Sequence, residues 1–452
     1  MSSLGNLLSG LKSFPGGIHP PDSKELSKSA QVQPFLPPAL VRVLMAQHIG
    51  APAKPVVKKK DAVKRGQVVG EAAGFVSACV HSPISGIVKD VEDFPSPVTG
   101  RPVASVVIES DGEDAWAEGV NVRQDPMSVE PKRVVELVQK AGVVGMGGAT
   151  FPTHVKLSPP PNAKIEHVII NGVECEPYLT SDYRLMLDQP DRIVTALRLI
   201  MKTVGAPRGH IGVEANKPDA FQALSLAAKG SSDVQVHLLQ VKYPQGAEHM
   251  LIKALEGREI PWKGGLPSAV GCLVHNAATA IAILDAVEFQ RPLIERLVCV
   301  TGEGVKIPAN LSVRIGTPIS AILEQQGLHD GANKVLFGGP MMGLAQASLD
   351  TPTMKGVNGI LVLRNAARWQ RRPCIRCGRC VDACPYRLIP SELSILGERE
   401  DWDAAAVANI MECKECGCCT YVCPSKRPIV QLVKFGKSEL ARKRRAQEKP
   451  KK

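Results

Sequence analysis

Two short runs of cysteine near the C-terminal end carry the strongest chemical signal in this chain. The first reads Cys374-Ile-Arg-Cys377-Gly-Arg-Cys380-Val-Asp-Ala-Cys384-Pro385, and the second reads Cys413-Lys-Glu-Cys416-Gly-Cys418-Cys419-Thr-Tyr-Val-Cys423-Pro424. In this C-x-x-C-x-x-C-x-x-x-C-P spacing, three thiolates hold one iron–sulfur cube and the fourth cysteine points toward a second cube. The two runs therefore predict two four-iron four-sulfur clusters and an electron-transfer protein of a reducing compartment.

Each predicted cluster takes three ligands from its own run and one from the other. The first cluster is assigned to Cys374, Cys377, Cys380 and Cys423, and the second to Cys413, Cys416, Cys419 and Cys384. Structural zinc is the alternative, but a zinc site needs only four ligands and does not explain the repeated triplet followed by Cys-Pro. Cys418 falls out of register and is interpreted as a spare buried thiol.

A glycine-rich segment, Gly142-Val-Val-Gly-Met-Gly-Gly-Ala-Thr-Phe-Pro-Thr-His-Val-Lys156, follows a helical run. Its glycines would let backbone amides approach a phosphate closely. Alone this is weak evidence, but three further segments accompany it: Asn171-Gly-Val-Glu-Cys-Glu-Pro177, Tyr243-Pro-Gln-Gly-Ala-Glu248, and Gly271-Cys-Leu-Val-His-Asn276 with Thr279.

These four segments resemble the NADH-binding 51 kDa flavoprotein subunit family of respiratory complex I, which binds FMN and NADH. The matching positions are Gly145, Gly147, Gly148, Phe151, Pro152, Thr153, Lys156, Asn171, Glu174, Glu176, Pro177, Tyr243, Gly246, Glu248, Asn276 and Thr279. The resemblance implies that Gly147, Gly148, Lys156, Asn171, Tyr243, Gly246, Asn276 and Thr279 hold the flavin and its phosphate. It implies that Phe151, Glu174, Glu176 and Glu248 face the nicotinamide nucleotide.

Three positions depart from that family's pattern. Met146 stands in place of an arginine, Ala247 in place of a glutamate, and His275 in place of an asparagine. These departures leave open a non-enzymatic iron–sulfur relay that has lost FMN. A further alternative is the diaphorase subunit of a soluble hydrogenase or formate dehydrogenase.

Over residues 14–433 the chain is similar to the family of C subunits of the Rnf, or ion-translocating oxidoreductase, complex. The resemblance is carried by Gly16-Gly-Ile-His-Pro-Pro21, Gln47-His-Ile-Gly-Ala-Pro52, Gly70-Glu-Ala-Ala-Gly-Phe-Val76, His81-Ser-Pro-Ile-Ser-Gly86 and Tyr243-Pro-Gln-Gly246, besides both cysteine runs. It implies a protein with two 4Fe-4S clusters and FMN that uses NADH or NAD as substrate. Its implied partners are the other subunits of a membrane complex and, indirectly, ferredoxin or flavodoxin.

The pattern of helices and strands expected around these residues predicts a multidomain fold of the α/β plus β class. Short strands with turns from about residue 32 to 110 indicate a small β-sandwich, and strand–helix alternation from about 131 to 296 indicates a largely parallel sheet. With the resemblance, the domains are an N-terminal arm (1–30), a barrel-sandwich hybrid (31–118), a Rossmann-like FMN/NADH domain (128–296), a soluble-ligand-binding β-grasp domain (297–364), a helical two-cluster ferredoxin domain (365–433) and a basic tail (434–452).

Two details of the sandwich region qualify its likeness to a lipoyl or biotinyl carrier. The modified-lysine hairpin of such carriers is absent around residues 74–77, so the domain is interpreted as a structural module. Lys60 stands where a glycine would ease the turn before Asp61, so that hairpin is expected to be distorted.

Composition narrows the classes of partner. The formal charge is +11, and two oxidised clusters would lower it to about +7. Much of the excess lies in the basic tail, interpreted as solvated and disordered, with anionic lipid or an acidic partner as alternatives. Aromatic residues make up only 4% and no recognition motif accompanies the basic run, so nucleic acid is not expected as a partner.

The expected location is peripheral, on the cytoplasmic side of the bacterial inner membrane. Residues 1–17 lack the features of an export signal, and charged residues or proline interrupt every apolar stretch. Two smaller expectations concern single residues. The ten histidines show no metal-binding pair, and Glu174 and Glu176 would share one face if they lay on a strand.

Overall fold

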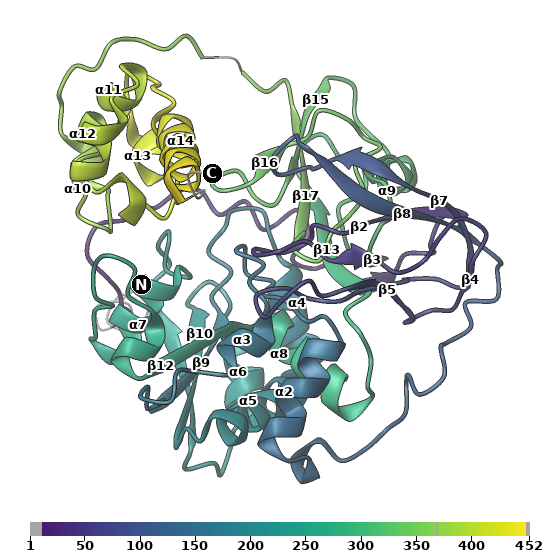
Figure 1. Cartoon of the computed structure of the whole chain (residues 1–452). Coiled ribbons are helices and arrows are strands. Elements are labelled where there is room, and N and C mark those ends of the chain that lie inside the picture. The colour runs from purple at the N-terminus through teal and green to yellow at the C-terminus, as the bar shows by residue number, and fades with distance from the viewer. Residues whose placement is uncertain (1–10, 368, 449–452) are drawn as a thin grey trace.

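The computed structural model describes residues 11–367 and 369–448. Figure 1 shows two β-rich domains beside each other, an α/β domain below them, and a helical C-terminal domain above helix α7. The long segment after β17 (Gly359–Arg364) runs over the top of the molecule before it reaches the C-terminal helices. Among the described residues, no helix combines the length and apolar character needed to cross a bilayer.

The first β-rich domain consists of two small sheets packed on each other. One sheet has the order β2 (Leu40–Leu44), β8 (Pro102–Ser110), β7 (Gly86–Pro95) and β4 (Ala62–Val63), and the other has β3 (Lys54–Pro55), β5 (Val68–Glu71) and β6 (Val80–His81). Their facing side chains are mostly buried valines and isoleucines. This confirms the expected barrel-sandwich. Lys60 has φ +77°, a conformation that favours glycine, as its position before Asp61 suggested.

The α/β domain is built on a parallel sheet with the order β11–β10–β9–β12. Its strands are β9 (His167–Gly172), β10 (Arg208–Glu214), β11 (Val234–Leu239) and β12 (Cys272–Asn276). Its helices are η1 (Pro126–Ser128), α2 (Pro131–Lys140), α3 (Thr153–Lys156), α4 (Ser181–Asp188), α5 (Pro190–Val204), α6 (Pro218–Ala227), α7 (Glu248–Glu256), η2 (Pro267–Val270) and α8 (Ala277–Glu288).

Alternate residues of β9 explain why both faces of this sheet are covered. Val168 and Ile170 belong to the core formed with α2, α5 and α8, whereas Ile169 packs on the opposite face with the apolar side of α7. A strand buried on both faces reads as a continuous apolar run, as parallel strands usually do. The chain leaves β9 toward β10 and β11 and then returns to place β12 on the other side of β9. The sheet therefore reverses its order between β9 and β12, where open α/β sheets bind ligands.

The second β-rich domain is a mixed sheet with the order β1–β14–β13–β17–β15–β16. Its remaining strands are β13 (Glu295–Thr301), β14 (Ala309–Arg314), β15 (Ala332–Phe337) and β16 (Leu344–Ala345), with helix α9 (Ile319–Gln326) packed against them. Strand β1 (Val32–Pro34) lies in the stretch that the sequence assigned to the sandwich, yet it pairs in parallel with β14. Three residues are too few to define their own partner, so long-range contacts decide the pairing.

The C-terminal domain is helical, as expected. It contains α10 (Arg379–Asp382), α11 (Pro390–Glu398), α12 (Trp402–Val407), η3 (Ile410–Glu412), α13 (Cys418–Val422) and α14 (Ile429–Glu448). The basic tail was interpreted as disordered, and this is wrong through Glu448: α14 continues through it, with Leu440 buried. Apolar side chains at helical spacing hold α14 on the domain core, so the charges lie on a folded element.

The N-terminal arm joins the α/β domain to the C-terminal domain. Its described part, residues 11–30, is irregular and forms isolated bridges, Lys12 with Leu239 and Ile18 with Tyr243. The amide of Gly17 donates to the carbonyl of Ala383 over 3.1 Å. The described part of the arm therefore contacts both domains.

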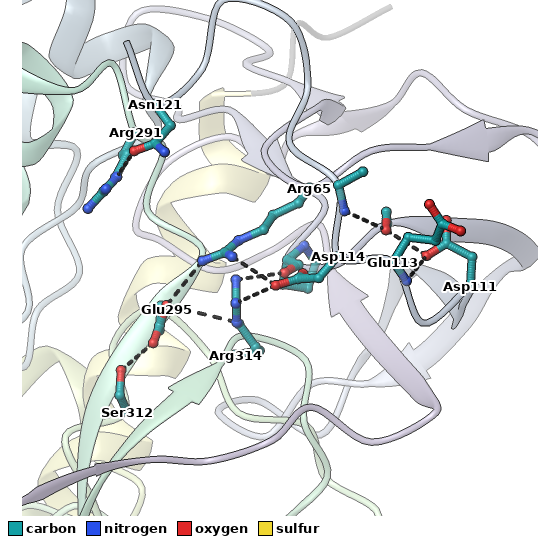
Figure 2. Close-up of polar contacts among 12 residues, drawn as sticks. Arg65, Asp111, Glu113, Asp114, Asn121, Arg291, Glu295, Ser312 and Arg314 are labelled. Atoms are coloured by element: carbon teal, nitrogen blue, oxygen red, sulfur yellow. Dashed lines mark hydrogen bonds and ion pairs between the residues drawn. The ribbon is translucent and has the colours of Figure 1, made fainter. Parts of the chain in front are cut away.

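An ion-pair network connects the two β-rich domains (Figure 2). Asp114 accepts from Arg65 of the sandwich over 2.8 Å and from Arg314 at the end of β14 over 2.9 Å. Glu295 lies 3.7 Å and 3.8 Å from the same two guanidiniums. The Arg65 guanidinium also stacks 3.9 Å from the centre of the Trp116 ring. Two cations held by two carboxylates fix the angle between these domains.

Candidate flavin and iron–sulfur site

Two asparagines lie side by side where β9 and β12 end. Asn171 and Asn276 are register partners, so both side chains reach the edge at which the sheet order reverses. Asn276 also begins helix α8, because its Oδ1 accepts from the amides of Ala278 over 2.9 Å and Thr279 over 3.3 Å. The edge thus combines a polar amide with a helix N-terminus, which favours an anionic group.

The glycine-rich loop packs onto this edge. The amide of Met146 donates to Thr279 Oγ1 over 2.9 Å, and the amide of Gly145 donates to the carbonyl of Phe151 over 2.8 Å. A Cβ on Gly147 would lie 3.2 Å from the Asn276 side chain. Gly148 has φ +122°, and a Cβ there would meet no atom within 4 Å. The loop is therefore tight against α8 at Gly147 and open at Gly148, a cradle that fits a flavin phosphate.

Lys156 is held beside this cradle at the end of α3. Its Nζ donates to Glu248 Oε1 over 2.9 Å and to the carbonyl of Val274 over 2.5 Å. Glu248 begins α7, so the ion pair links the glycine-rich segment to the Tyr243 turn. The lysine side chain remains partly exposed.

The Tyr243 turn meets Asn171 from the other side. Asn171 Nδ2 donates to the carbonyl of Gly246 over 2.8 Å, and the Gly246 amide donates to Cys175 Sγ over 3.3 Å. A Cβ at Gly246 would lie 3.2 Å from Cys175 Sγ, which is a tight contact. The four segments singled out in the sequence therefore converge on one edge of the sheet, and the residues present fit FMN.

The two acidic residues of the Asn171–Pro177 segment do not share a face. Strand β9 ends at Gly172, and Glu174 has φ +45°, so the pair does not lie on a strand. Glu174 accepts from the amides of Asp182 over 2.7 Å and Tyr183 over 3.1 Å, where helix α4 begins. Glu176 instead accepts from the amides of Met342 over 2.7 Å and Met341 over 3.2 Å. Burial raises the pKa of Glu176 to about 7.

Two charged residues of this site were missed by the sequence reasoning. Asp182 Oδ2 accepts from Asn276 Nδ2 over 2.5 Å, and burial together with the charge of Glu174 raises the pKa of Asp182 to about 7. Arg296 in β13 lies 2.8 Å from the sulfur of Met146, and burial lowers its pKa to about 10. A guanidinium from another domain thus contacts the loop position where the family pattern has arginine. No local sequence signal could reveal this contact, because 150 residues separate the two partners.

The cysteines of the second run gather around a cavity in the C-terminal domain. It is lined by Cys384, Cys413, Cys416 and Cys419, together with Cys418 and Tyr386. Cys384 comes from the first run, so its place here agrees with the crossed ligation expected from the spacing. Burial raises the pKa of Cys413 to about 11, so a bound metal would have to stabilise the thiolate. Gly378 and Gly417 have φ +78° and +86°, as close chain turns beside a cluster require.

The cysteines of the first run lie nearer the surface. Cys380, Cys419, Cys423, Ile429 and Val430 form one buried cluster, which brings both Cys419 and Cys423 of the second run near Cys380 of the first. Cys374 is half-buried and Cys377 is exposed. Cys418 is fully buried and contacts the carbonyl of Tyr243.

The α/β domain touches the second cysteine run directly. Tyr243 Oη donates to the carbonyl of Cys416 over 2.7 Å, and Tyr243 itself is only 2% exposed. Ile18, Tyr243, Ala383 and Cys418 form one buried apolar cluster, with Cys175 packed against it. The turn that lines the flavin cradle therefore also supports one cluster site.

Four domain families match successive parts of the chain. They are the RnfC barrel sandwich hybrid domain (residues 12–113), the Nuo51 FMN-binding domain (138–285), the SLBB domain (297–345) and the 4Fe-4S dicluster domain (373–426). A chain from the crystal structure of NAD+-reducing [NiFe]-hydrogenase in the H2-reduced state is similar in fold, with a TM-score of 0.50 and 18% identity. That similarity covers 72% of this chain and 68% of the other.

An FMN-binding domain joined to a two-cluster domain defines an electron-transfer flavoprotein with iron–sulfur centres. This chain is 46% identical to the C subunit of the proton-translocating ferredoxin:NAD(+) oxidoreductase complex of Clostridium ljungdahlii, over 95% of this chain and 94% of that protein. It is 44% identical to the Na(+)-translocating counterpart of Acetobacterium woodii, over 96% and 98%. Identity to the C subunit of the ion-translocating oxidoreductase complex of Rhodobacter capsulatus is 40%, over 98% and 86%. The chain belongs to the family of Rnf complex C subunits.

Proposed function

We propose that this chain is the peripheral electron-input subunit of a membrane-bound Rnf-type complex. It exchanges electrons between NADH and ferredoxin or flavodoxin through FMN and two 4Fe-4S clusters, and partner subunits couple this exchange to ion translocation. The observation that carries the proposal is the Tyr243 turn, which lines the flavin cradle and hydrogen-bonds to the Cys416 loop. The proposed flavin site, which handles two electrons, and the proposed second-run cluster site, which handles one, are thus both lined by the Tyr243 turn.

The residues around the cradle have separate tasks in this proposal. Lys156, the amides near Gly147 and Gly148, and the N-terminus of α8 hold the flavin phosphate. When bound, FMN accepts a hydride and releases electrons one at a time, and the protein supplies position and electrostatics. Glu248 and Phe151 face the nucleotide. Glu174 and Glu176 support this surface through the amides that they bind.

The order of the two clusters in this proposal follows from the hydrogen bond between Tyr243 and Cys416. The second-run cluster, held by Cys384, Cys413, Cys416 and Cys419, is proximal to the flavin because it adjoins Tyr243. Cys374, Cys377, Cys380 and Cys423 would hold the first-run cluster nearer the surface, where it would supply one-electron transfer to partner subunits. Ile375 is 66% exposed and Trp369 is 69% exposed beside it, which suits docking. We place this docking face at the cytoplasmic side of the cell membrane.

The decisive experiment is anaerobic purification followed by flavin extraction, iron and sulfide counts, and addition of NADH. The proposal predicts about one FMN, about eight irons and bleaching of the cluster absorption by NADH. A colourless extract after denaturation, with clusters intact, would favour the flavin-free relay. NADH-dependent reduction of soluble acceptors in a protein that never assembles with membrane subunits would favour the diaphorase.

A further inference from the structure

Three histidines form a diagonal ladder across one face of the parallel sheet. His167 opens β9, His210 lies in β10 and His237 lies in β11. His210 is the register partner of Ile169, two residues beyond His167, and His237 is the partner of Gly212, two residues beyond His210. Side chains two residues apart point the same way, so all three imidazoles lie on the face covered by α7. Nothing in the sequence pointed to this grouping, in which His167 and His210 meet Glu256 with their ligand atoms within 4.8 Å of one another.

The rings are close enough to contact one another. His167 Nδ1 faces His210 Nε2 at 2.9 Å, and His210 Nδ1 faces His237 Nε2 at 2.9 Å. His167 and His210 are 5% and 6% exposed. Neutral imidazoles present lone pairs that can bind a metal.

A carboxylate closes this group from the helix above. Glu256 is the last residue of α7, and its Oε2 lies 3.5 Å from His167 Nδ1 while its Oε1 lies 3.5 Å from His210 Nε2. The three ligand atoms lie within 4.8 Å of one another. Tetrahedral ligands about 2.0–2.1 Å from zinc stand roughly 3.3 Å apart. Separations of 2.9, 3.5 and 3.5 Å therefore need only small shifts to surround one ion.

We propose that His167, His210 and Glu256 bind a divalent transition-metal ion of the zinc class. His237 supports the site by contacting the other ring nitrogen of His210, which is the usual arrangement around a ligating histidine. The ion fastens the C-terminal end of α7 to β9 and β10. Because Glu248 begins the same helix, the site stabilises the element that carries one wall of the cradle.

The donor set distinguishes this ion from other cations. Two imidazoles and one carboxylate suit zinc, whereas calcium and magnesium need mostly oxygen ligands. Lys12 lies nearby, donating to the carbonyl of Leu255 over 2.9 Å, and its charge disfavours ions held by electrostatics alone. Binding must therefore come from coordination by nitrogen. The cysteine runs cannot supply this site, since they lie in another domain.

The test is zinc binding to the anaerobically reconstituted full chain, whose cysteines already hold iron. We expect about one zinc per chain after dialysis, measured by elemental analysis with an unchanged iron count. X-ray absorption should show nitrogen and oxygen neighbours at about 2.0–2.1 Å rather than sulfur at about 2.3 Å. Glu256→Gln should weaken binding by at least about tenfold, since even supporting residues contribute that much.

Glu259→Gln is the matched control, because this exposed carboxylate lies three residues further on and pairs with Lys253. It should bind zinc like the unaltered chain. Retained FMN and iron in Glu256→Gln would show that the variant folds, and His167→Gln provides a second variant with the same expected loss. No zinc in the unaltered chain, equal zinc in Glu256→Gln, or zinc bound by sulfur would each overturn the site.

Discussion

At the scale of single residues, the flavin cradle depends on a few charges that local sequence patterns cannot all place. Lys156 is a cation that the glycine-rich motif itself indicated, and its ammonium group donates a hydrogen bond to Glu248. Arg296 and Asp182 were invisible in the sequence because their contacts cross domains or helix starts. Burial makes these groups sensitive to both substitution and pH.

Lys156→Glu should expel FMN and leave both clusters assembled. The substitution puts a carboxylate beside Glu248 and the flavin phosphate, so like charges replace an ion pair. We expect flavin content to fall by about tenfold or more, equivalent to roughly 1.4 kcal/mol of binding. Flavin extraction and iron counts measure both outcomes. Lys164→Glu, at a position outside the cradle, is the control, and retained flavin in Lys156→Glu would contradict the phosphate assignment.

Glu176 should make the α/β domain less stable as pH rises. Its folded pKa of about 7 lies above the ordinary glutamate value of 4.5, so the folded state binds more protons between these limits. The contribution of Glu176 to folding stability is therefore greatest below about pH 4.5 and is lost as the pH rises to about 7. Glu176→Gln should reduce the fall in Tm between about pH 5 and pH 8 by about 2–4 °C, if screening leaves roughly 1 kcal/mol.

Differential scanning calorimetry of the holoprotein at both pH values measures this change. Glu118→Gln, at an exposed position, provides the control and should show the same pH dependence as the unaltered chain. An unchanged pH dependence in Glu176→Gln would assign the titration to another group.

At the scale of elements, the features that depend on local sequence periodicity were predicted, whereas pairings between distant strands were not. The repeated turns of the sandwich, the alternation of the α/β domain and the cysteine runs all appear where the sequence placed them, because each depends on neighbours within a few residues. Strand β1 and the histidine ladder were missed because their partners are far away in the chain. His167 and His210 are 43 residues apart, and His210 and His237 are 27 apart. Only the strand register brings them together.

In the crossed ligation proposed above, the exchanged cysteines, Cys384 and Cys423, follow helices α10 and α13. Cys423→Ser should remove mainly the first-run cluster, because Cys423 packs beside Cys380. We expect iron content to fall by about half and the proximal cluster to keep its redox signal, as two four-iron clusters require. Electron paramagnetic resonance of the reduced protein distinguishes the two centres.

Cys418→Ser is the control for this substitution, because Cys418 lies outside both ligand sets and should retain all iron. Cys384→Ser should instead remove the second-run cluster. Equal loss of both clusters in either variant, or equal retention, would exclude crossed ligation.

At the scale of the whole molecule, two contacts hold the domains in register. The network around Asp114 fixes one β-rich domain on the other (Figure 2), and the Tyr243 turn fixes the α/β domain on the cluster domain. The arm adds a third connection through Gly17. Electron transfer from the flavin to a partner requires that these contacts keep the domains close together.

Asp114→Asn should loosen the two β-rich domains. It leaves Arg65 and Arg314 with only Glu295 nearby, and burial has already lowered the pKa of Arg65. Because Asp114 is partly exposed, we expect the substitution to lower the free energy of unfolding by about 1 kcal/mol, which is less than the loss of a buried ion pair would cause. Thermal unfolding and limited proteolysis between residues 115 and 130 measure it. Glu113→Gln, at an exposed neighbouring position, should change neither the Tm nor the proteolysis. An unaltered Tm in Asp114→Asn would show that this network does not contribute to stability.

Tyr243→Phe tests whether the α/β domain and the proximal cluster work as one unit. The substitution keeps the buried ring and removes only the hydroxyl that donates to the Cys416 carbonyl. Electron tunnelling rates fall steeply with distance, so a small separation at this junction should slow cluster reduction several-fold. NADH should still reduce the flavin at its normal rate, which stopped-flow absorbance resolves from cluster bleaching. Tyr421→Phe, on the exposed side of α13, should slow neither step. If the clusters of Tyr243→Phe are reduced at the unaltered rate, the hydrogen bond to Cys416 does not set the distance over which electrons enter the clusters.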